Sequence, residues 1–340
     1  MQKILVIQTA FIGDVVLATA LIEKLHAFYP NAQIDFLVRK GNEALLTGHP
    51  FLHEVLIWDK REHKHRNLFN LIRRVRRTKY DTVINAQRFA ATGLLTALSG
   101  AGQTIGFDKN PLSLLFSKKI PHIVGNRHEI ERNQALIAAL TDDQPAKPRL
   151  YPTQADEEKV RPYKTKPYIT VSPASVWFTK QYPKEKWTSF LQQLPMECTI
   201  YLLGAPNDKD LCEEIKAAHP KAFNLSGTLS FLQSAALMKD AGMNYVNDSA
   251  PMHFASAVNA PVTAVYCSTI PAFGFGPMSD KSYIVEIQQP LDCRPCGLHG
   301  YRACPLGHFK CAYKIEDAQL LETLTGESSA HYITSRPATS

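Results

Sequence analysis

The stretch "KILVIQTAFIGDVVLATALIEKLHAFYPNAQIDFLV", residues 3–38, decides the fold class. Residues 3–8 form a short β-rich run, and a turn containing Gly13 leads from it into an apolar segment with helical periodicity. Pro30 ends that segment, and residues 33–38 form the next β-rich run. A strand, a helix and a second strand in this order predict the start of a parallel α/β sheet.

The same alternation continues to residue 107 and restarts at residue 168. Between the two series, residues 141–167 contain five prolines and many charges, which is typical of a linker. A chain of 340 residues is also longer than one hydrophobic core usually grows. We therefore expect two α/β domains with a ligand cleft between them. The expected divisions are an N-terminal domain at 1–155, a C-terminal domain at 156–325 and a polar tail at 326–340.

In the second series, the stretch "VNDSAPMHF", residues 246–254, changes from a strand pattern to a helix pattern. Asp248 or Ser249 can cap the helix, and Pro251 suits its first turn. Backbone amides and the helix dipole at such an end attract anions, phosphate above all. His253 follows Ser249 by four residues, so its imidazole can reach the same space. The alternative is ordinary capping beside a core histidine.

Two more strand ends in this domain carry polar side chains. After the strand at 168–172, Ser175 and Lys180 can form a pyrophosphate clamp, although a surface lysine is the alternative. After the strand at 198–204, Asp208 can accept hydrogen bonds from ribose hydroxyls, although it can equally cap a helix. Because the carboxyl ends of parallel strands share one edge, the three strand ends together predict a nucleotide-diphosphate site.

In the first domain, Gly13 and Asp14 lie between strand and helix. The pattern G-x-G-x-x-G is absent there, which argues against a nicotinamide cofactor. Asp14 stands at a helix start, where the dipole favours its ionised form, and we expect it to face the cleft. A carboxylate in that position can act as a general base on a hydroxyl, or serve only as a helix cap.

A cysteine-rich segment, "DCRPCGLHGYRACPLGHFKC", follows residue 290. A C-x-x-C pair with two further thiols can hold a structural Zn²⁺ ion. Packed free thiols and a redox-labile loop are the alternatives. The candidate metal ligands are Cys293, Cys296, Cys304 and Cys311.

The formal charge of +7 is concentrated in residues 60–79, which carry nine Lys or Arg and one acid. Outside this stretch, 29 basic and 30 acidic residues nearly cancel. Such a patch favours a phosphorylated partner or an anionic surface, although a solvated helix face is the alternative. No uninterrupted apolar run approaches the roughly 20 residues of a membrane-spanning helix, so a cytoplasmic location is expected.

Taken in order, these motifs resemble those of the lipopolysaccharide heptosyltransferases, glycosyltransferase family 9. The resemblance lies in the opening stretch, in "TKQYPKEKW", "LLGAPND" and "VNDSAPMHFASAVNAPVTAVY", and in the cysteine-rich segment. It implies a GT-B architecture, in which two Rossmann-like domains with parallel sheets face each other across a cleft. It also implies inverting transfer of a heptose from ADP-heptose to the lipid A-linked inner core of lipopolysaccharide. No cofactor is then needed for catalysis, and structural zinc stays open.

Carried onto this chain, the resemblance makes Asp14 the base. It makes Lys180 and Ser175 phosphate contacts and Asp208 a ribose contact. The floor of the diphosphate site would be Asp248, Ser249, Ala250 and His253, with Ala250 where the family often has glycine. The acceptor would be an anionic glycolipid, contacted by Gly13, Arg61 and Lys64. The protein would then associate peripherally with the inner membrane, where clustered Lys and Arg add roughly 1 kcal/mol each.

Two rival functions remain at this point. A nucleotide-sugar epimerase on the same architecture would convert the donor without an acceptor. A zinc-dependent nucleic-acid-binding protein would use the basic stretch, but Phe69 is the only aromatic residue there and stacking platforms are missing. Nucleic acid is therefore not an expected partner.

Overall fold

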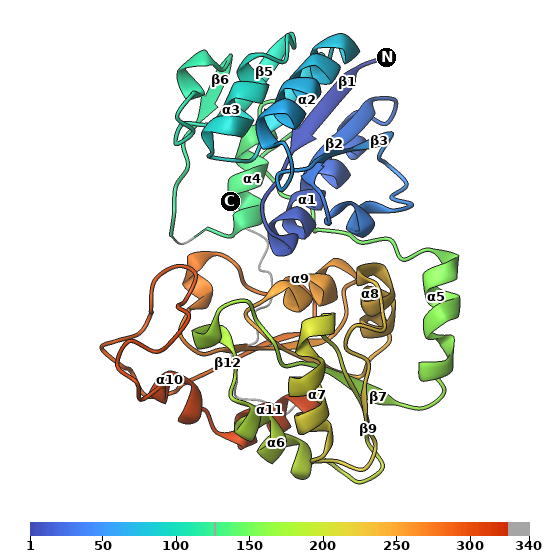
Figure 1. The fold of residues 1–340 in the computed structure, drawn as a ribbon, viewed down its shortest axis with the longest axis vertical. Coiled ribbons are helices and arrows are strands. Elements are labelled where there is room, and N and C mark those ends of the chain that lie inside the picture. Colours follow the sequence, from blue (N-terminus) through green and yellow to red (C-terminus); the bar gives the residue numbers. More distant parts are fainter. Residues whose placement is uncertain (126, 326–340) are drawn as a thin grey trace. The chain divides into compact units, whose positions relative to one another are not determined.

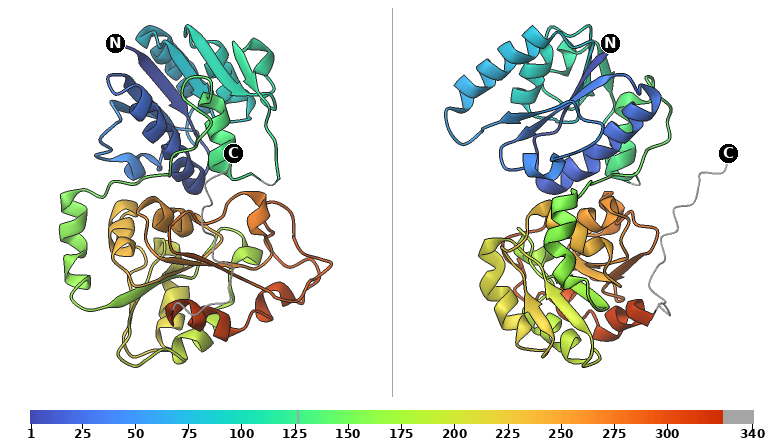
Figure 2. Two further views of the ribbon diagram at one scale, coloured as in Figure 1. Left: turned by 180° about the vertical axis from the view of Figure 1, so that it is seen from behind. Right: turned by 90° about the vertical axis from the view of Figure 1, so that its right-hand side faces the viewer.

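The computed structural model describes residues 1–125 and 127–325, so the expected polar tail lies outside the described residues. The chain divides into two compact units, Met1–Tyr151 and a second that starts at Pro152. Each unit is a six-stranded sheet flanked by helices on both faces (Figures 1 and 2).

All neighbouring strands of the first sheet are parallel, in the order β3-β2-β1-β4-β5-β6. The strands are β1 (Lys3–Ile7), β2 (Gln33–Arg39), β3 (Glu54–Trp58), β4 (Thr82–Asn85), β5 (Gln103–Phe107) and β6 (Lys118–Ile120). The helices are α1 (Ile12–Phe28), α2 (Lys64–Thr78), α3 (Ala90–Ala97) and α4 (Glu129–Ile137), with 3₁₀ turns η1 (Glu43–Leu46) and η2 (Ser113–Leu115).

The central strands β1 and β4 are almost wholly buried because helices cover both faces of the sheet. On one face, Leu71 and Val75 of α2 pack in one buried cluster with Leu5 and Ile7 of β1. On the other face lie α1 and α4, which pack against each other (Figure 2). The opposite side of α2 is left to charged side chains, so the helix is strongly amphipathic.

The second sheet is also parallel, in the order β12-β11-β10-β7-β8-β9. Its strands are β7 (Tyr168–Ser172), β8 (Thr199–Leu202), β9 (Ala222–Asn224), β10 (Asn244–Asn247), β11 (Val262–Tyr266) and β12 (Ser282–Glu286). Its helices are α5 (Gln154–Val160), α6 (Lys184–Gln192), α7 (Lys209–Lys216), α8 (Phe231–Lys239), α9 (Ala250–Ala257), α10 (Lys310–Tyr313) and α11 (Asp317–Thr325). Its 3₁₀ turns are η3 (Arg161–Tyr163), η4 (Phe178–Lys180), η5 (Pro206–Asp208) and η6 (Pro271–Phe273).

Both sheets have the same topology when the strands are counted within each unit. The order is 3-2-1-4-5-6, that of nucleotide-binding doubly wound folds, which confirms the expected α/β class. In such sheets the strand order reverses between the first and fourth strands, and ligands bind outside the carboxyl ends there. The two reversal points are β1/β4 and β7/β10.

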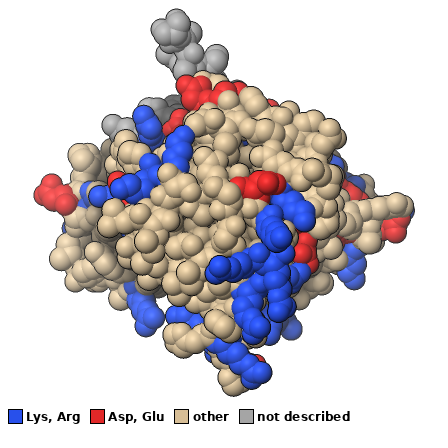
Figure 3. Space-filling view, turned by 90° about the horizontal axis from the view of Figure 1, so that it is seen from above, with Lys and Arg blue, Asp and Glu red and all other residues tan. Residues whose placement is uncertain are grey.

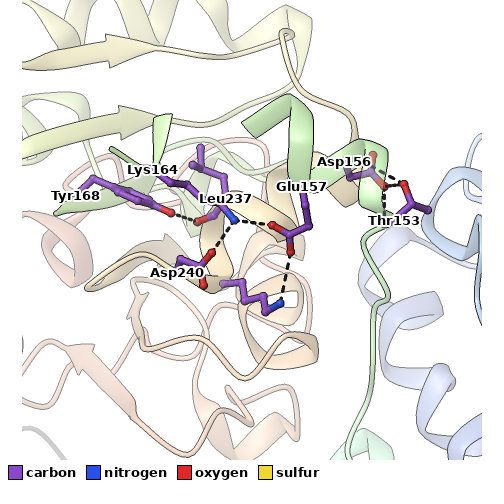
Figure 4. A network of polar contacts seen from close by, with 8 residues as sticks. Thr153, Asp156, Glu157, Lys164, Tyr168, Leu237 and Asp240 are labelled. Carbon is purple, nitrogen blue, oxygen red and sulfur yellow. Dashed lines mark hydrogen bonds and ion pairs between the residues drawn. The ribbon is translucent and has the colours of Figure 1, made fainter. Parts of the chain in front are cut away.

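The predicted linker is wrong over part of its length, because α5 lies inside residues 141–167. Thr153 and Asp156 form a capping box: the Asp156 carboxylate accepts from the Thr153 backbone N at 2.9 Å. Figure 4 shows how the segment is then fastened to the domain. The Lys164 ammonium lies 2.7 Å from Glu157 and 2.6 Å from Asp240. The five prolines of the segment favoured a linker, so this short capped helix was not predicted.

Candidate active site

Asp14 is the third residue of α1, at the carboxyl end of β1. Its Oδ2 accepts a hydrogen bond from the Phe11 backbone N at 3.2 Å, so it closes the first turn of the helix. Burial raises the pKa of Asp14, while hydrogen bonds from the Phe11 and Asp14 backbone and the charges of Arg88 and Arg39 oppose that rise. The carboxylate is therefore a stronger base than a solvated aspartate, which suits proton abstraction.

The sequence reasoning missed two cations at strand ends near Asp14, Arg39 and Arg88, and placed Lys60 only in the basic stretch. Arg39 ends β2, and its Cζ lies 4.9 Å from the centre of the Phe11 ring. Arg88 follows β4 and, like Arg39, acts on the Asp14 charge. The Lys60 ammonium follows β3 and donates to the Thr9 carbonyl at 2.9 Å. The sequence could have indicated these cations by their position, because each lies within three residues of the end of a strand.

The predicted acceptor residues Arg61 and Lys64 are both exposed and extend this group of cations. The charge of Arg61 lowers the pKa of Arg39, after burial, which is the larger cause. Burial, followed by the charges of Arg39 and Lys64, lowers the pKa of Lys60 to about 8. We call Arg39, Lys60, Arg61, Lys64 and Arg88 the basic cluster. Gly13 lies beside Asp14 in the first turn of α1.

Replacing Arg88 with glutamine should move the acidic limb of the kcat/KM pH profile to higher pH. The Arg88 charge lowers the pKa of Asp14, so its removal lets the raised pKa rise further. A base works only when deprotonated, and activity on the acidic side is therefore lost earlier as the pH falls. Arg161→Gln is the control, because this exposed arginine of the second unit is not among the charges that act on Asp14. Coincident profiles for Arg88→Gln and the parent would contradict the assignment.

In the second unit, Asn247 joins the ends of β7 and β10. This buried amide accepts from the Tyr182 backbone N at 2.9 Å and donates to the Pro173 carbonyl at 2.7 Å. The loop that carries Ser175 and Lys180 is thereby held at both ends against β10. Asn247 thus links the end of β10 to the loop after β7 by hydrogen bonds, a role that the sequence reasoning did not assign.

Lys180 and Asp248 form an ion pair at this reversal point. The Lys180 ammonium lies 2.7 Å from Asp248 Oδ2, and the two side chains are 15% and 7% exposed. The Thr269 hydroxyl donates to the same carboxylate oxygen at 2.6 Å. Asp248 therefore holds the lysine in place instead of capping α9. A lysine fixed in this way is a preformed site for a phosphate charge.

The first turn of α9 has no side-chain cap from its N-cap residue, Ser249. The Ser249 hydroxyl lies 3.4 Å from the Asn247 carbonyl instead, so Ser249 does not cap the helix. Ala250 is the first residue of the helix, and His253 is buried one turn on. Helix ends without such a cap favour anion binding. The structure thus brings Lys180, Asp248, Ser249, Ala250 and His253 to one region.

Ser175 and Asp208 occupy the neighbouring loops. Ser175 is half-buried after β7, and its carbonyl accepts from Gln181 Nε2 at 2.5 Å. Asp208 Oδ2 accepts from the Ala205 backbone N at 2.7 Å and so closes η5, but as the N-cap residue of α7 it makes no side-chain cap. A carboxylate can accept several hydrogen bonds, so the ribose contact stays a prediction.

The sequence profile of glycosyltransferase family 9 (heptosyltransferase) matches residues 68–299. The chain belongs to this family. The match spans the loop after β7, the start of α9 and part of the cysteine-rich segment. The predictions of the family and of a glycosyltransferase activity are confirmed.

Relatives and solved structures agree with this assignment. Lipopolysaccharide heptosyltransferase 3 of Escherichia coli is 26% identical over 279 residues, covering 76% of this chain and 82% of that protein. The structure of E. coli ADP-heptose lps heptosyltransferase II has a TM-score of 0.78 at 22% identity, covering 96% of this chain and 98% of that one. The glycosyl transferase family 9 structure from Veillonella parvula reaches 0.84 at 20% identity, covering 96% and 98%. These likenesses confirm the predicted GT-B fold class.

The predicted zinc site of this family 9 transferase stays a prediction. Within residues 1–125 and 127–325, no group of three or more His, Cys, Asp or Glu side chains is placed to hold a metal ion. Cys311 belongs to the hydrophobic core, and Cys304 packs against it. Burial raises the pKa of the Cys311 thiol to about 12, and the Cys296 thiol donates to the Cys293 carbonyl at 3.1 Å. Cys304 and Cys311 are thus packed, as the free-thiol alternative expects.

The two rival functions lose support. Membership of family 9 favours glycosyl transfer over both the epimerase and the nucleic-acid hypothesis. In the described residues, no helix is both long enough and apolar enough to cross a bilayer.

Proposed function

We propose that this family 9 transferase moves a heptose from ADP-heptose to the inner core of lipopolysaccharide, with inversion. The single observation that carries the proposal is the half-buried Asp14 carboxylate, made more basic by burial and kept beside cations. The E. coli structure described as ADP-heptose lps heptosyltransferase II supports the choice of donor. The E. coli lipopolysaccharide heptosyltransferase 3 supports the choice of acceptor.

In the proposed reaction, Asp14 removes the proton from an acceptor hydroxyl as its oxygen attacks the anomeric carbon. The new bond forms on the face opposite the leaving group, so the bond to the diphosphate oxygen breaks with inversion. ADP leaves with the bonding electrons. Lys180 and the backbone amides at the start of α9 stabilise its developing negative charge. The reaction needs no metal ion, because these groups supply the positive charge.

The test is to incubate the purified protein with ADP-heptose and a heptose-free, lipid A-linked acceptor. We expect ADP release and a mass gain of one heptose on the acceptor. UDP-, GDP- and CDP-sugars serve as competing donors. A new donor isomer formed without any acceptor would favour the epimerase, and transfer from another nucleotide sugar alone would overturn the donor assignment.

We also propose that the exposed face of α2 binds the anionic surface of the membrane in which the acceptor is embedded. Figure 3 shows lysine and arginine side chains gathered in a band on the face seen from above. On α2, Arg66, Arg73, Arg76 and Arg77 are exposed. A groove of about 500 Å³ is lined by Asn70, Arg73, Arg74, Arg77 and Thr78. Clustered arginines attract acidic headgroups by roughly 1 kcal/mol each.

Reversing the charge of Arg66, Arg73 and Arg77 to glutamate should abolish cosedimentation with phosphatidylglycerol vesicles. The matched control changes Lys159, Lys209 and Lys221, exposed residues of the second unit, to glutamate. Both variants alter the net charge equally, and only the first alters α2. Binding of the parent should also weaken as salt is added. Equal loss in both variants would reduce the surface proposal to an effect of net charge.

A further inference from the structure

The cysteine-rich segment packs on the turn that carries Lys180. Thr179, fully buried beside it, joins the two: its hydroxyl accepts from the Tyr301 backbone N at 2.7 Å. Its backbone N donates to the Tyr301 carbonyl at 3.1 Å. Ser268, which follows β11, donates its hydroxyl to the Thr179 hydroxyl at 3.0 Å. The backbone carbonyl of Ser268 accepts from the Cys296 backbone N at 2.8 Å, so three loops meet at Thr179.

Gly300 is the point of closest approach between the segment and the lysine. It is buried, and its φ of +76° is a conformation that side chains rarely adopt. A Cβ there would lie 2.9 Å from the Thr179 hydroxyl oxygen and 3.0 Å from Lys180 Cγ. Cβ atoms do not approach this closely, so any side chain would displace the stem of Lys180 or the Thr179 hydroxyl.

Arg294 fastens the same segment to the loop after β11. Its guanidinium donates to the carbonyls of Cys267 at 2.8 Å and Thr269 at 2.7 Å, and it pairs with Glu286 at 2.5 Å. The Thr269 side chain is the one that holds Asp248. Residues 294–301 therefore support both members of the Lys180–Asp248 pair. Gly300 lies against the stem of Lys180, and Arg294 holds Thr269, which bonds Asp248.

We propose that residues 294–301 are the positioning element of the phosphate site and that Gly300 is its key positioning residue. The inference rests on the proposed function, in which Lys180 binds the diphosphate of the donor. Lysine has a flexible stem, so a fixed ammonium needs packing along its carbons as well as a partner at its tip. The segment supplies that packing, and the preorganised charge meets the leaving group without reorganisation.

The test compares Gly300→Ala with Gly307→Ala. Gly307 lies in the same segment at a φ of +69°, but a Cβ there has no atom within 4 Å. Both changes place a side chain at a similar positive φ, and only Gly300→Ala reaches Lys180. We expect Gly300→Ala to weaken ADP binding and lower kcat/KM for the donor by about tenfold, with KM for the acceptor unchanged. Gly307→Ala should leave all three values near those of the parent.

A double-mutant cycle separates positioning from general damage. If Gly300 acts through Lys180, Gly300→Ala should add almost nothing in a Lys180→Met background. A full additional tenfold loss there would overturn the inference and leave the proposed function intact. If Lys180→Met itself leaves ADP binding unchanged, the phosphate role of Lys180 fails, and the positioning role falls with it.

A second pair of variants covers the case in which Gly300→Ala does not fold. Thr179→Val removes the hydroxyl that bonds Tyr301 and Ser268, and Thr179→Ser keeps it. We expect weaker ADP binding in the first and recovery in the second. Unchanged ADP binding in folded Thr179→Val would count against the positioning element.

Discussion

Asp14→Asn should lower kcat by about 10²–10⁴-fold, the range that a positioned general base contributes, and leave ADP affinity unchanged. The amide keeps the shape of the side chain and an oxygen that can accept from Phe11, so the start of α1 is preserved. It cannot take a proton from the acceptor hydroxyl. Steady-state kinetics and calorimetric titration with ADP together measure the two quantities.

The matched control is Asp156→Asn. Asp156 occupies the equivalent capping position in α5, where its carboxylate accepts from the Thr153 backbone N. The same chemical change there tests the cost of losing a capping carboxylate, and it should leave kcat near the parent value. Near-parental transfer by Asp14→Asn would remove the base from the mechanism. A comparable loss in both variants would indicate damage to folding.

The strand-end residues of both sites could be predicted from the sequence because parallel strands end at one edge. That rule brought Lys180 and Asp248 together, and Asp14 was chosen as a carboxylate at a helix start. The structure puts each at a reversal point of its sheet. The rule also covers Arg39, the last residue of β2, and Arg88, which follows β4 by three residues. They were missed because a single arginine after a strand is chemically unspecific until a carboxylate is seen beside it.

Contacts between distant segments could not be predicted. The Thr179–Tyr301 hydrogen bonds span 122 residues, and the Asn247–Tyr182 bond spans 65. Nothing in the local pattern of Gly300 distinguishes it from Gly307, since both have positive φ and both lie among cysteines. The spacing of the four cysteines suggested a metal, but it did not show that Cys311 belongs to the hydrophobic core or that Cys304 packs against it. Tertiary packing gives these residues their roles.

Lys180→Met should lower kcat/KM for the donor by about 10²–10³-fold, the effect of removing one preorganised group from a developing negative charge. A loss of activity has a second interpretation, because the change also leaves the buried Asp248 carboxylate without its cation. Removing one member of a buried pair typically costs about 3–5 kcal/mol of stability. With side chains 15% and 7% exposed, this pair is close to that case. A fall in activity could then reflect a smaller folded fraction.

The double variant Lys180→Met/Asp248→Asn separates the two readings. A neutral amide can keep an oxygen for the Thr269 hydroxyl and carries no buried charge, so most of the lost stability should return. The rate should not return, because no cation meets the leaving diphosphate. Thermal unfolding and donor kinetics on the same samples give the answer. Recovery of stability and activity together would show that the lysine serves the fold, whereas recovery of stability alone assigns its charge to the leaving group.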